Sequence, residues 1–448
     1  MTAPDACAYG ELARHHRTLV TFALLGGLAV FLAGSLACGL AGTMEVLIVS
    51  RAVQGLGAGA LLTLGMALIR DLHPPSRAAG LIRMQTVLAA MMVLGMVGGP
   101  IVGGLLADHA GWRWAFWLNL PLGLAAAAVL TLVLPDRRSA SAPSGRLDVA
   151  GVLLLTAGLS LALTGLSLKG DISAGHPLPW SDPAVAGCLL AGLVLLALLV
   201  PVERRAAVPV LPLRLFRNRT YSALLTGGFF FQAAALPVGV LLPLYFQYVR
   251  GHSATVSGLL LIPLLIGMAL GNRLTATAVL RSGRAKPVLL AGAGLLTAGT
   301  AAFVALDAAT PSALTSVWLL IAGLGTGPAM GGITIATQNC VPHADMGTAT
   351  AGSALAKQIG GAFGLACVQS LTSHHLATVP GAPATGSTTA SDIGSTVAWT
   401  GAVAGLLALA ALLLMRDLPT PTPGSRRGKA PGKGCQAPRP GAGVRGRR

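Results

Sequence analysis

The sequence predicts an all-α polytopic membrane protein with about 12 membrane-spanning helices. Hydrophobic residues make up 54% of the 448-residue chain, and charged residues only 10%. Soluble domains carry about 25% charged residues, so the mean hydropathy of +0.73 indicates a chain that lies in the bilayer. A spanning helix needs roughly 20 mostly apolar residues. The uncharged runs place the expected spans at residues 19–41, 46–69, 84–107, 114–134, 149–168, 184–202, 221–248, 255–279, 287–306, 313–336, 347–371 and 395–415.

Positive charges alternate between the loops that separate these spans. Every second loop is rich in arginine, and most of the loops between them hold one basic residue or none. The basic residues of the rich loops are Arg70, Arg77, Arg83, Arg137, Arg138, Arg146, Arg204, Arg205, Arg214, Arg217, Arg219, Arg281, Arg284 and Lys286. The positive-inside rule therefore predicts a multi-pass protein of the plasma (inner) membrane with both termini in the cytoplasm. The loop before residue 347, which contains Asp345 and no Lys or Arg, is the exception.

The formal net charge of +17 does not indicate a nucleic-acid partner. Nine of the 31 Lys and Arg residues lie in the tail 416–448, which is rich in Gly and Pro and is expected to be disordered. Most of the others lie in short loops beside apolar spans, where basic residues are attracted to anionic lipids. We therefore expect anionic lipids as partners and no nucleic acid.

The sequence contains no pattern of an enzyme or a metal site. The six cysteines show no CxxC spacing, and no HExxH, nucleophile elbow or carboxylate pair occurs. The glycine-rich runs at 55–59 and 323–327 lack the preceding strand and the lysine of a nucleotide loop. We expect no catalytic residue, no cofactor and no metal.

Two basic residues lie at a depth where charges are costly. Arg51 follows Glu45 by six residues, about 9 Å into its helix, and Lys357 lies about 15 Å into the span that begins at Gly347. Such charges are candidates for function unless they snorkel or only fix packing by an ion pair. Gln54 lies one turn after Arg51 on the same face. None of the 14 Asp and Glu residues lies deep in a span, so no carboxylate is placed there to carry a proton.

Uncharged amides within the spans are also candidates. Each can line a polar cavity or make an interhelical hydrogen bond worth roughly 1 kcal/mol, and the sequence leaves both roles open. These residues are Asn119, Gln232, Gln247, Asn272, Gln338, Asn339 and Gln358.

A run of glycines around Pro100 lies inside the charge-free stretch 84–107. Proline removes a backbone donor, and each glycine costs roughly 1 kcal/mol against alanine, so this helix is not built for strength. In a membrane, small residues four apart let helices approach closely. We expect packing ridges at Gly55/Gly59, at Gly95/Gly99/Gly103 and at Gly360/Gly364.

Several motifs occur in the order found in the major facilitator superfamily. Residues 47–58, Leu-Ile-Val-Ser-Arg-Ala-Val-Gln-Gly-Leu-Gly-Ala, resemble the RxxQGxGA motif of that family's fourth helix, and residues 95–104 resemble its GxxxGPxxGG antiporter motif. Residues 112–121, Trp-Arg-Trp-Ala-Phe-Trp-Leu-Asn-Leu-Pro, look like the WRWxFxxNxP entry to the sixth helix. Residues 242–247, with Gly258 and Pro263, and residues 357–362 look like segments of the 14-helix drug:proton antiporters of the EmrB/QacA type.

The resemblance, which covers about residues 30–415, implies a major facilitator fold and an exporter of drugs or secondary metabolites. In such a carrier two bundles rock about a midplane cavity, and proton influx drives efflux of lipophilic small molecules. The proline helix would bend or seal between the halves, and Arg51 would influence proton transfer. The candidates for proton coupling or gating are Arg51, Gln54, Gly55, Gly95, Gly99, Pro100, Gly103 and Gly104. The candidates for the substrate cavity are Asn119, Gln232, Tyr245, Gln247, Lys357 and Gln358.

The chain departs from the family pattern near its N-terminus. By motif order its first span corresponds to the family's third helix, and residues 10–17 lack the Asp and the second Gly of the GxLaDRxGRR loop. We therefore expect an incomplete N-terminal bundle at 1–134, two linker helices and a cytoplasmic loop at 135–220, a six-helix C-terminal bundle at 221–415, and the tail 416–448. Because the family's buried carboxylate would lie in the unmatched helices, we expect little proton-coupled transport by this chain alone. The alternative is a truncated, inactive membrane protein or a remnant that needs a partner.

Overall fold

The computed structural model describes residues 23–72, 78–133, 148–169, 178–205, 213–342, 345–377 and 386–416. Every regular element in these ranges is a helix. Ten of the described helices are long and apolar enough to cross a membrane by length and composition. α3 (Ala78–His109) and α13 (Met346–Ala377), each 32 residues long, occupy the two remaining expected spans. The prediction of an all-α protein with about 12 spans is confirmed.

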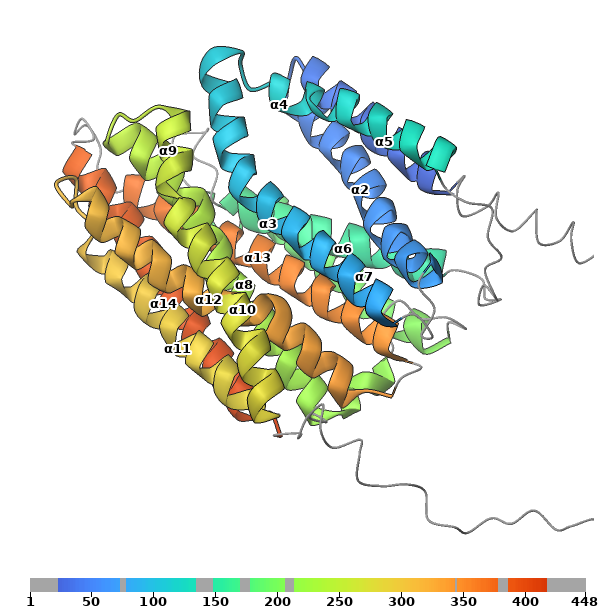
Figure 1. Ribbon diagram of the computed structural model, residues 1–448. Coiled ribbons are helices and arrows are strands. Elements are labelled where there is room, and N and C mark those ends of the chain that lie inside the picture. The colour runs from blue at the N-terminus through green and yellow to red at the C-terminus, as the bar shows by residue number, and fades with distance from the viewer. Residues whose placement is uncertain are drawn as a thin grey trace, which may run out of the picture.

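The N-terminal part begins with a helix over Ala23–Leu40. It continues with α2 (Met44–Leu72), α3, α4 (Trp114–Trp117) and α5 (Asn119–Val133). The expected span 114–134 is divided at Leu118, because Pro121 lacks the backbone N–H that would bond the carbonyl of Trp117. α3 contains Pro100, and it changes direction in its upper part (Figure 1).

Two further helices connect this part to the rest of the chain. α6 (Val149–Lys169) and α7 (Pro183–Arg205) pack against each other as an antiparallel pair. Gly158 lies against Leu196, and Gly165 lies against Leu189, so glycines on α6 let the two helices approach. α6 also contacts α13.

The C-terminal part contains the remaining elements. A 3₁₀ turn, η2, and a π-helix, η3, lie at the two ends of α8, and a second 3₁₀ turn, η4, follows α11. The bounds are η2 (Leu213–Arg217), α8 (Arg219–Leu244), η3 (Tyr245–Val249), α9 (Ala254–Leu260), α10 (Ile262–Ser282), α11 (Lys286–Ala301), η4 (Ala302–Ala305), α12 (Ser312–Cys340), α13 and α14 (Gly386–Leu413).

α12 is the central helix of this C-terminal part, and 61% of the 18-residue apolar stretch that could span the membrane is buried. It packs on α10 and α11 through glycines. A Cβ on Gly323 would overlap the carbonyl of Leu264, and a Cβ on Gly325 would overlap the backbone of Leu296. The Gly323–Gly327 run therefore serves helix packing, which agrees with the rejection of a nucleotide loop at this site.

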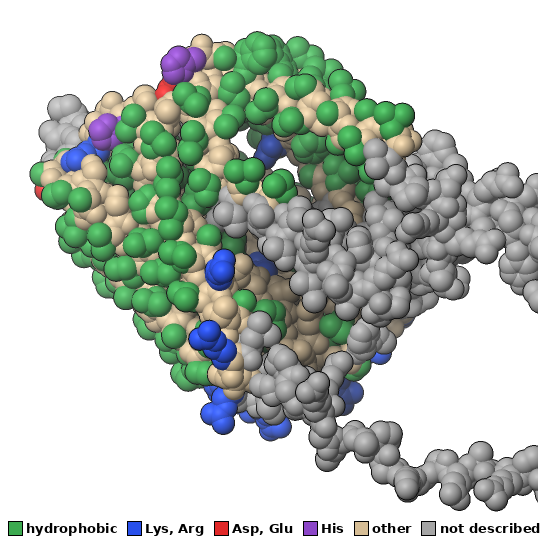
Figure 2. All heavy atoms as spheres, in the orientation of Figure 1, with side chains coloured by type: hydrophobic (Ala, Val, Ile, Leu, Met, Phe, Trp, Pro, Cys, Tyr) green, Lys and Arg blue, Asp and Glu red, His purple; other side chains and the backbone are tan. Residues whose placement is uncertain are grey.

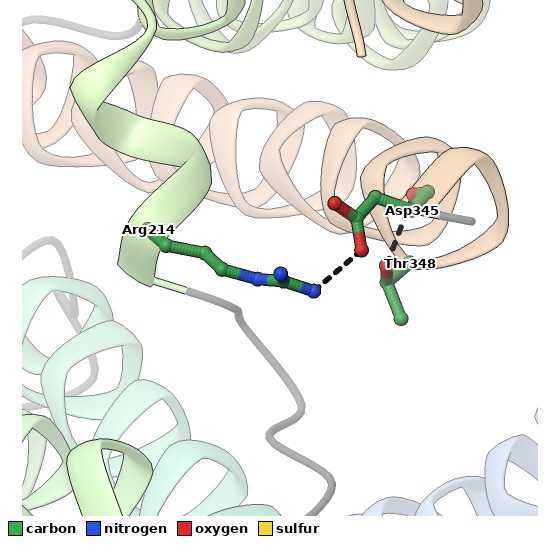
Figure 3. A network of polar contacts seen from close by, with 3 residues as sticks. All are labelled: Arg214, Asp345 and Thr348. Atoms are coloured by element: carbon green, nitrogen blue, oxygen red, sulfur yellow. Dashed lines mark hydrogen bonds and ion pairs between the residues drawn. The ribbon is translucent and has the colours of Figure 1, made fainter. Parts of the chain in front are cut away.

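One end of the C-terminal part is fixed by polar contacts from η2. Arg214 Nη2 lies 2.5 Å from Oδ1 of Asp345, whose carbonyl accepts a hydrogen bond from Thr348 (Figure 3). Asn218, the N-cap of α8, donates to the carbonyl of Cys340 at 2.8 Å. The exposed Arg214 adds little stability, but its pairing positions η2 beside α13. The acidic residue of the exceptional loop is thus paired with a residue of a basic loop.

Two groups of helices lie on either side of α3. The helix over 23–40, α2 and α5 form one group, and α8 to α14 form the other (Figure 1). Figure 2 shows that this face of the molecule is hollowed between the two groups. Lys and Arg side chains gather at the lower end of the second group in the same view.

Candidate functional site

A chain of hydrogen bonds centred on Ser35 joins four helices of the N-terminal part: the helix over 23–40, α2, α4 and α5. Its hydroxyl accepts hydrogen bonds from Nε2 of Gln54 at 2.9 Å and from Nδ2 of Asn119 at 3.0 Å. It donates to the carbonyl of Phe116 at 2.9 Å. Ser35 is fully buried, so each of these bonds satisfies a polar group that would otherwise be costly in the membrane.

Two glycines bring α2 close enough to the helix over 23–40 for these bonds. A Cβ on Gly34 would lie 2.5 Å from the backbone nitrogen of Gln54, and a Cβ on Gly57 would overlap the backbone of Phe31. Neither position therefore has room for a larger residue. The contact holds Gln54 at 4% exposure beside Ser35.

Arg51 is the exposed end of this cluster. Its Nη1 donates to Oε1 of Gln54 at 2.8 Å, and its Cζ lies 5.7 Å from the centroid of the Phe116 ring. No carboxylate of the described residues pairs with the guanidinium. The structure thus joins Arg51, Gln54 and Asn119, which the sequence analysis singled out separately, into one hydrogen-bonded chain.

α3 meets the C-terminal group at α9, and the contact is made by the predicted glycine–proline segment. A Cβ on Gly104 would lie 2.7 Å from the carbonyl oxygen of Ala254, and a Cβ on Gly258 would lie 2.5 Å from the carbonyl oxygen of Pro100. One glycine from each helix therefore allows the two backbones to touch. The helices run antiparallel, since later residues of α3 meet earlier residues of α9.

Asp108, one residue beyond the expected span, completes this contact. Its carboxylate accepts hydrogen bonds from the backbone nitrogens of Ala254 and Thr255 at 3.0 and 2.8 Å, and from the Thr255 hydroxyl at 2.6 Å. The hydrogen bonds from Thr255, from its side chain first and then its backbone, lower the pKa of Asp108 from 3.8 to about 2. The carboxylate is therefore ionised at every physiological pH.

The predicted packing ridges are only partly correct. Gly360 and Gly364 pack directly on the backbone of α8, as predicted. For Gly95, Gly99 and Gly103 on α3, and for Gly55 and Gly59 on α2, no atom of the described residues lies within 4 Å of a Cβ placed there. The ridge prediction fails for these five, because α3 contacts α9 through the face that holds Pro100 and Gly104, and α2 contacts its neighbour through Gly57.

Lys357 lies within the C-terminal group, on α13. Its stem passes Gly228 of α8, where a Cβ would lie 3.2 Å from the lysine Cγ, and its Nζ lies 3.5 Å from the carbonyl oxygen of Ala329 on α12. The side chain is half-buried, and no carboxylate in the described part of the chain pairs with it. The neighbouring Gln358 is exposed, and Gln232 of α8 is half-buried.

Tyr245 does not line a cavity in this structure, contrary to the prediction. The π-helix η3 turns its ring into the core, where it is fully buried, and its hydroxyl donates to the carbonyl of Asp307 at 2.7 Å. Arg250, at the end of the same turn, donates to the carbonyl of Ala308. These bonds hold the loop that precedes α12. Gln247 of η3 is half-buried.

Sequence reasoning did not single out Ser35, Asp108 or Arg273. Arg273 lies in α10, about 13 Å before its end at Ser282, and it is exposed. The depth argument that found Arg51 and Lys357 applies equally to this charge. Nothing in the sequence distinguishes Ser35 or Asp108, because each is made important by hydrogen bonds to residues of other helices.

No group of three or more His, Cys, Asp or Glu side chains in the described residues is placed to hold a metal ion.

Residues 11–365 match the family described as the Major Facilitator Superfamily. This match covers well over half of the chain. The chain belongs to this superfamily.

Relatives in the superfamily have names that refer to transport and resistance. The chain is 35% identical over 343 residues to an uncharacterized MFS-type transporter of Mycobacterium tuberculosis, covering 77% of this chain and 48% of the relative. It is 30% identical to the multidrug transporter protein MdtP of Bacillus subtilis, covering 76% and 61%. It is also 30% identical to the tetracenomycin C resistance and export protein of Streptomyces glaucescens, covering 80% and 63%. The chain thus spans about half to two thirds of the length of these relatives.

Solved structures of superfamily transporters share the fold. An auto-inhibited peptide transporter of the POT family aligns with a TM-score of 0.59 at 18% identity, covering 93% of this chain and 84% of that one. A bacterial homologue of the human lysosomal transporter Spinster aligns with a TM-score of 0.55 at 16% identity, covering 88% and 83%. At these identities the likeness shows the fold alone.

Proposed function

We propose that this superfamily member exports drugs or secondary metabolites by alternating access, as a carrier of the 14-helix drug:proton antiporter kind. The observation that carries the proposal is the contact of Pro100 and Gly104 on α3 with α9, which joins the N-terminal helices to the C-terminal group. This contact consists of backbone atoms and glycines, without large interdigitated side chains. The N-terminal helices and the C-terminal group can therefore separate here without repacking of side chains. The multidrug and export names of the relatives support the direction of transport.

We propose proton antiport as the coupling. Gln54 orients Arg51, and a guanidinium lowers the pKa of a carboxylate placed beside it, which favours release of that carboxylate's proton. Of the remaining candidates, Pro100 and Gly104 lie at the contact with α9, so we propose them as the gating residues. A Cβ on Gly55, Gly95, Gly99 or Gly103 would meet no described atom, and these four stay candidates for coupling alone. Since none of the chain's 14 acidic residues lies deep in a span, we propose that the chain alone couples transport to protons only weakly.

We propose that the substrate is a lipophilic small molecule. The cavity candidates that are half-buried or exposed in this structure are Asn119, Gln232, Gln247, Lys357 and Gln358. Asn119 is also held by its hydrogen bond to Ser35. Amides orient a ligand by hydrogen bonds, and an unpaired ammonium adds affinity for an acidic group. Lys357 therefore extends the range of substrates toward lipophilic anions.

We propose that the protein lies in the plasma membrane with both termini in the cytoplasm. The basic loops, including the residues that gather at the lower end in Figure 2, would then face the cytoplasm and anionic lipids. The α3–α9 contact would lie at the outer end of the pathway.

The test uses the 448-residue chain reconstituted in liposomes preloaded with an unlabelled lipophilic dye. Counterflow of the labelled dye should exceed that of protein-free liposomes several-fold, because exchange needs alternating access but no proton. An imposed pH gradient should add little to it. Counterflow equal to that of empty liposomes would contradict transport, whereas strong accumulation that a protonophore abolishes would contradict weak coupling.

A further inference from the structure

We propose that Asp108 and Thr255 form a latch that closes the α9 end of the pathway and opens during each transport cycle. Its role in transport rests on the proposed function, but the latch itself rests on contacts between α3 and α9.

The latch is a helix cap supplied by the other half of the molecule. The first backbone N–H groups of a helix have no partner within it. In α9, the carboxylate of Asp108 accepts hydrogen bonds from the backbone N–H groups of Ala254 and Thr255. The hydroxyl oxygen of Ser253 accepts a hydrogen bond from the backbone N–H of Val256 at 3.3 Å. The Thr255 hydroxyl adds a third bond to the carboxylate. Half of the cap of α9 therefore depends on the position of α3.

The backbone contact between α3 and α9 next to the latch aligns its two residues. Gly104 lies one turn before Asp108 on the same face of α3, and it packs on Ala254 and Thr255. Pro100, one turn earlier, packs on Gly258. These contacts place the carboxylate over the start of α9, so the latch closes only when the two helices are fully together.

The latch is suited to repeated opening because its carboxylate is close to water. Asp108 is exposed, so its carboxylate and the N–H groups of α9 can be hydrated when the helices part. Breaking a buried charge pair would instead leave an unpaired charge in the membrane. Among the described residues, α3 contacts α9 more extensively than it contacts α10.

Within the described residues, few charged groups flank the latch along the chain. On α3 the neighbour is His109, whose Nδ1 lies 3.0 Å from the carbonyl oxygen of Leu105, and before α9 lie Arg250 and His252. None of them forms an ion pair with Asp108. The latch is therefore governed by the geometry of α3 and α9.

A reversible cross-link tests whether the latch opens. In a chain whose native cysteines are replaced by serine, the pair Asp108→Cys and Thr255→Cys should form a disulfide on oxidation. Counterflow should then fall at least tenfold and return on reduction, whereas the two single-cysteine variants should not respond to oxidant. Complete cross-linking with unchanged counterflow would show a permanent joint and overturn the proposal.

A second measurement does not depend on transport. Ala254→Cys should react several-fold faster with a membrane-impermeant maleimide when Asp108→Asn is added, and less so with Thr255→Val. Ser181→Cys, at an exposed position in the loop before α7, is the control and should not change. No difference at Ala254→Cys would overturn the latch. Faster labelling without counterflow in any sample would keep the latch and refute the transport function.

Discussion

The side-chain amide of Gln54 connects Arg51 to Ser35. Its oxygen accepts a 2.8 Å hydrogen bond from Arg51, and its nitrogen donates a 2.9 Å hydrogen bond to Ser35 on the preceding helix. An amide that makes both bonds cannot rotate without losing them. The direction of Arg51 is therefore set by the packing of two helices and not by α2 alone.

Replacement of Arg51 should abolish export without preventing membrane insertion. Arg51→Ala removes a charge that no described carboxylate neutralises, so the loss should fall on function. We expect counterflow to fall at least tenfold while the amount of protein in the membrane stays the same. Unchanged dye counterflow would remove Arg51 from the site.

Ser35→Ala should lower stability more than its small size suggests. The change leaves the carbonyl of Phe116 without its donor and two amide groups without their acceptor. We expect a loss of about 1–2 kcal/mol, measured as a lower unfolding temperature in detergent. Ser282→Ala is the control, since that hydroxyl lies at the exposed end of α10 and its bonds are local, to the backbone of Ala278 and of Arg284. Equal effects of the two changes would show that the Ser35 cluster is not stabilising.

The effects of Gly104→Ala and Gly99→Ala on transport should distinguish the face of α3 that contacts α9 from the opposite face. A methyl group at Gly104 would press on the backbone of α9, whereas at Gly99 it would meet no described atom. We expect Gly104→Ala to impair counterflow severalfold, and Gly99→Ala to leave it within twofold. Pro100→Leu, which places a larger side chain on the contact face, should abolish counterflow without preventing insertion. Loss of counterflow in Gly99→Ala alone would contradict this assignment of faces.

The closed contact of α3 and α9 should not respond to pH in the physiological range. The pKa of Asp108 is about 2 in the contact and 3.8 ordinarily, so the stabilisation is complete above pH 3.8 and is lost as the pH falls toward 2. Spin labels at Leu105→Cys and Val256→Cys should therefore report one distance from pH 8 to pH 5. A change of distance within that range would mean that another group titrates at the contact.

Lys357→Met should change which substrates are accepted. Among the described residues, the ammonium has the carbonyl of Ala329 as its hydrogen-bond acceptor and no carboxylate, so an acidic ligand would be its natural partner. We expect affinity for a lipophilic anionic dye to fall about tenfold, while affinity for a neutral dye of similar size changes less than twofold. Lys357→Arg keeps the charge and should retain binding of the anion. A parallel loss for both dyes in Lys357→Met would indicate a structural role.

Composition and motif order were enough to predict the helices. Length and hydropathy decide where a chain can cross a bilayer, and each expected span coincides with a helical segment in the structure. The interruptions at Leu118 and Tyr245 were not predicted. Pro121 and Pro243 mark them in the sequence, but a proline does not say which geometry the chain adopts next to it.

The candidate site was only partly predictable, because its residues depend on contacts between helices. Arg51 and Gln54 share a helix face, so the sequence could pair them. Their link to Asn119 passes through Ser35, and no spacing along the chain indicates that serine. The sequence does not distinguish the glycines of α3 from one another. Only the packing of the folded helices shows that Gly104 contacts α9, whereas Gly99 does not.

The pairing of Pro100 with Gly258 and of Gly104 with Ala254 defines a register between two antiparallel helices. The Asp108 carboxylate lies one turn beyond Gly104 in the same register, over the first turn of α9. A slip of one helical turn along either helix would carry the carboxylate away from Ala254 and Thr255, so the capping bonds form in a single alignment of α3 and α9.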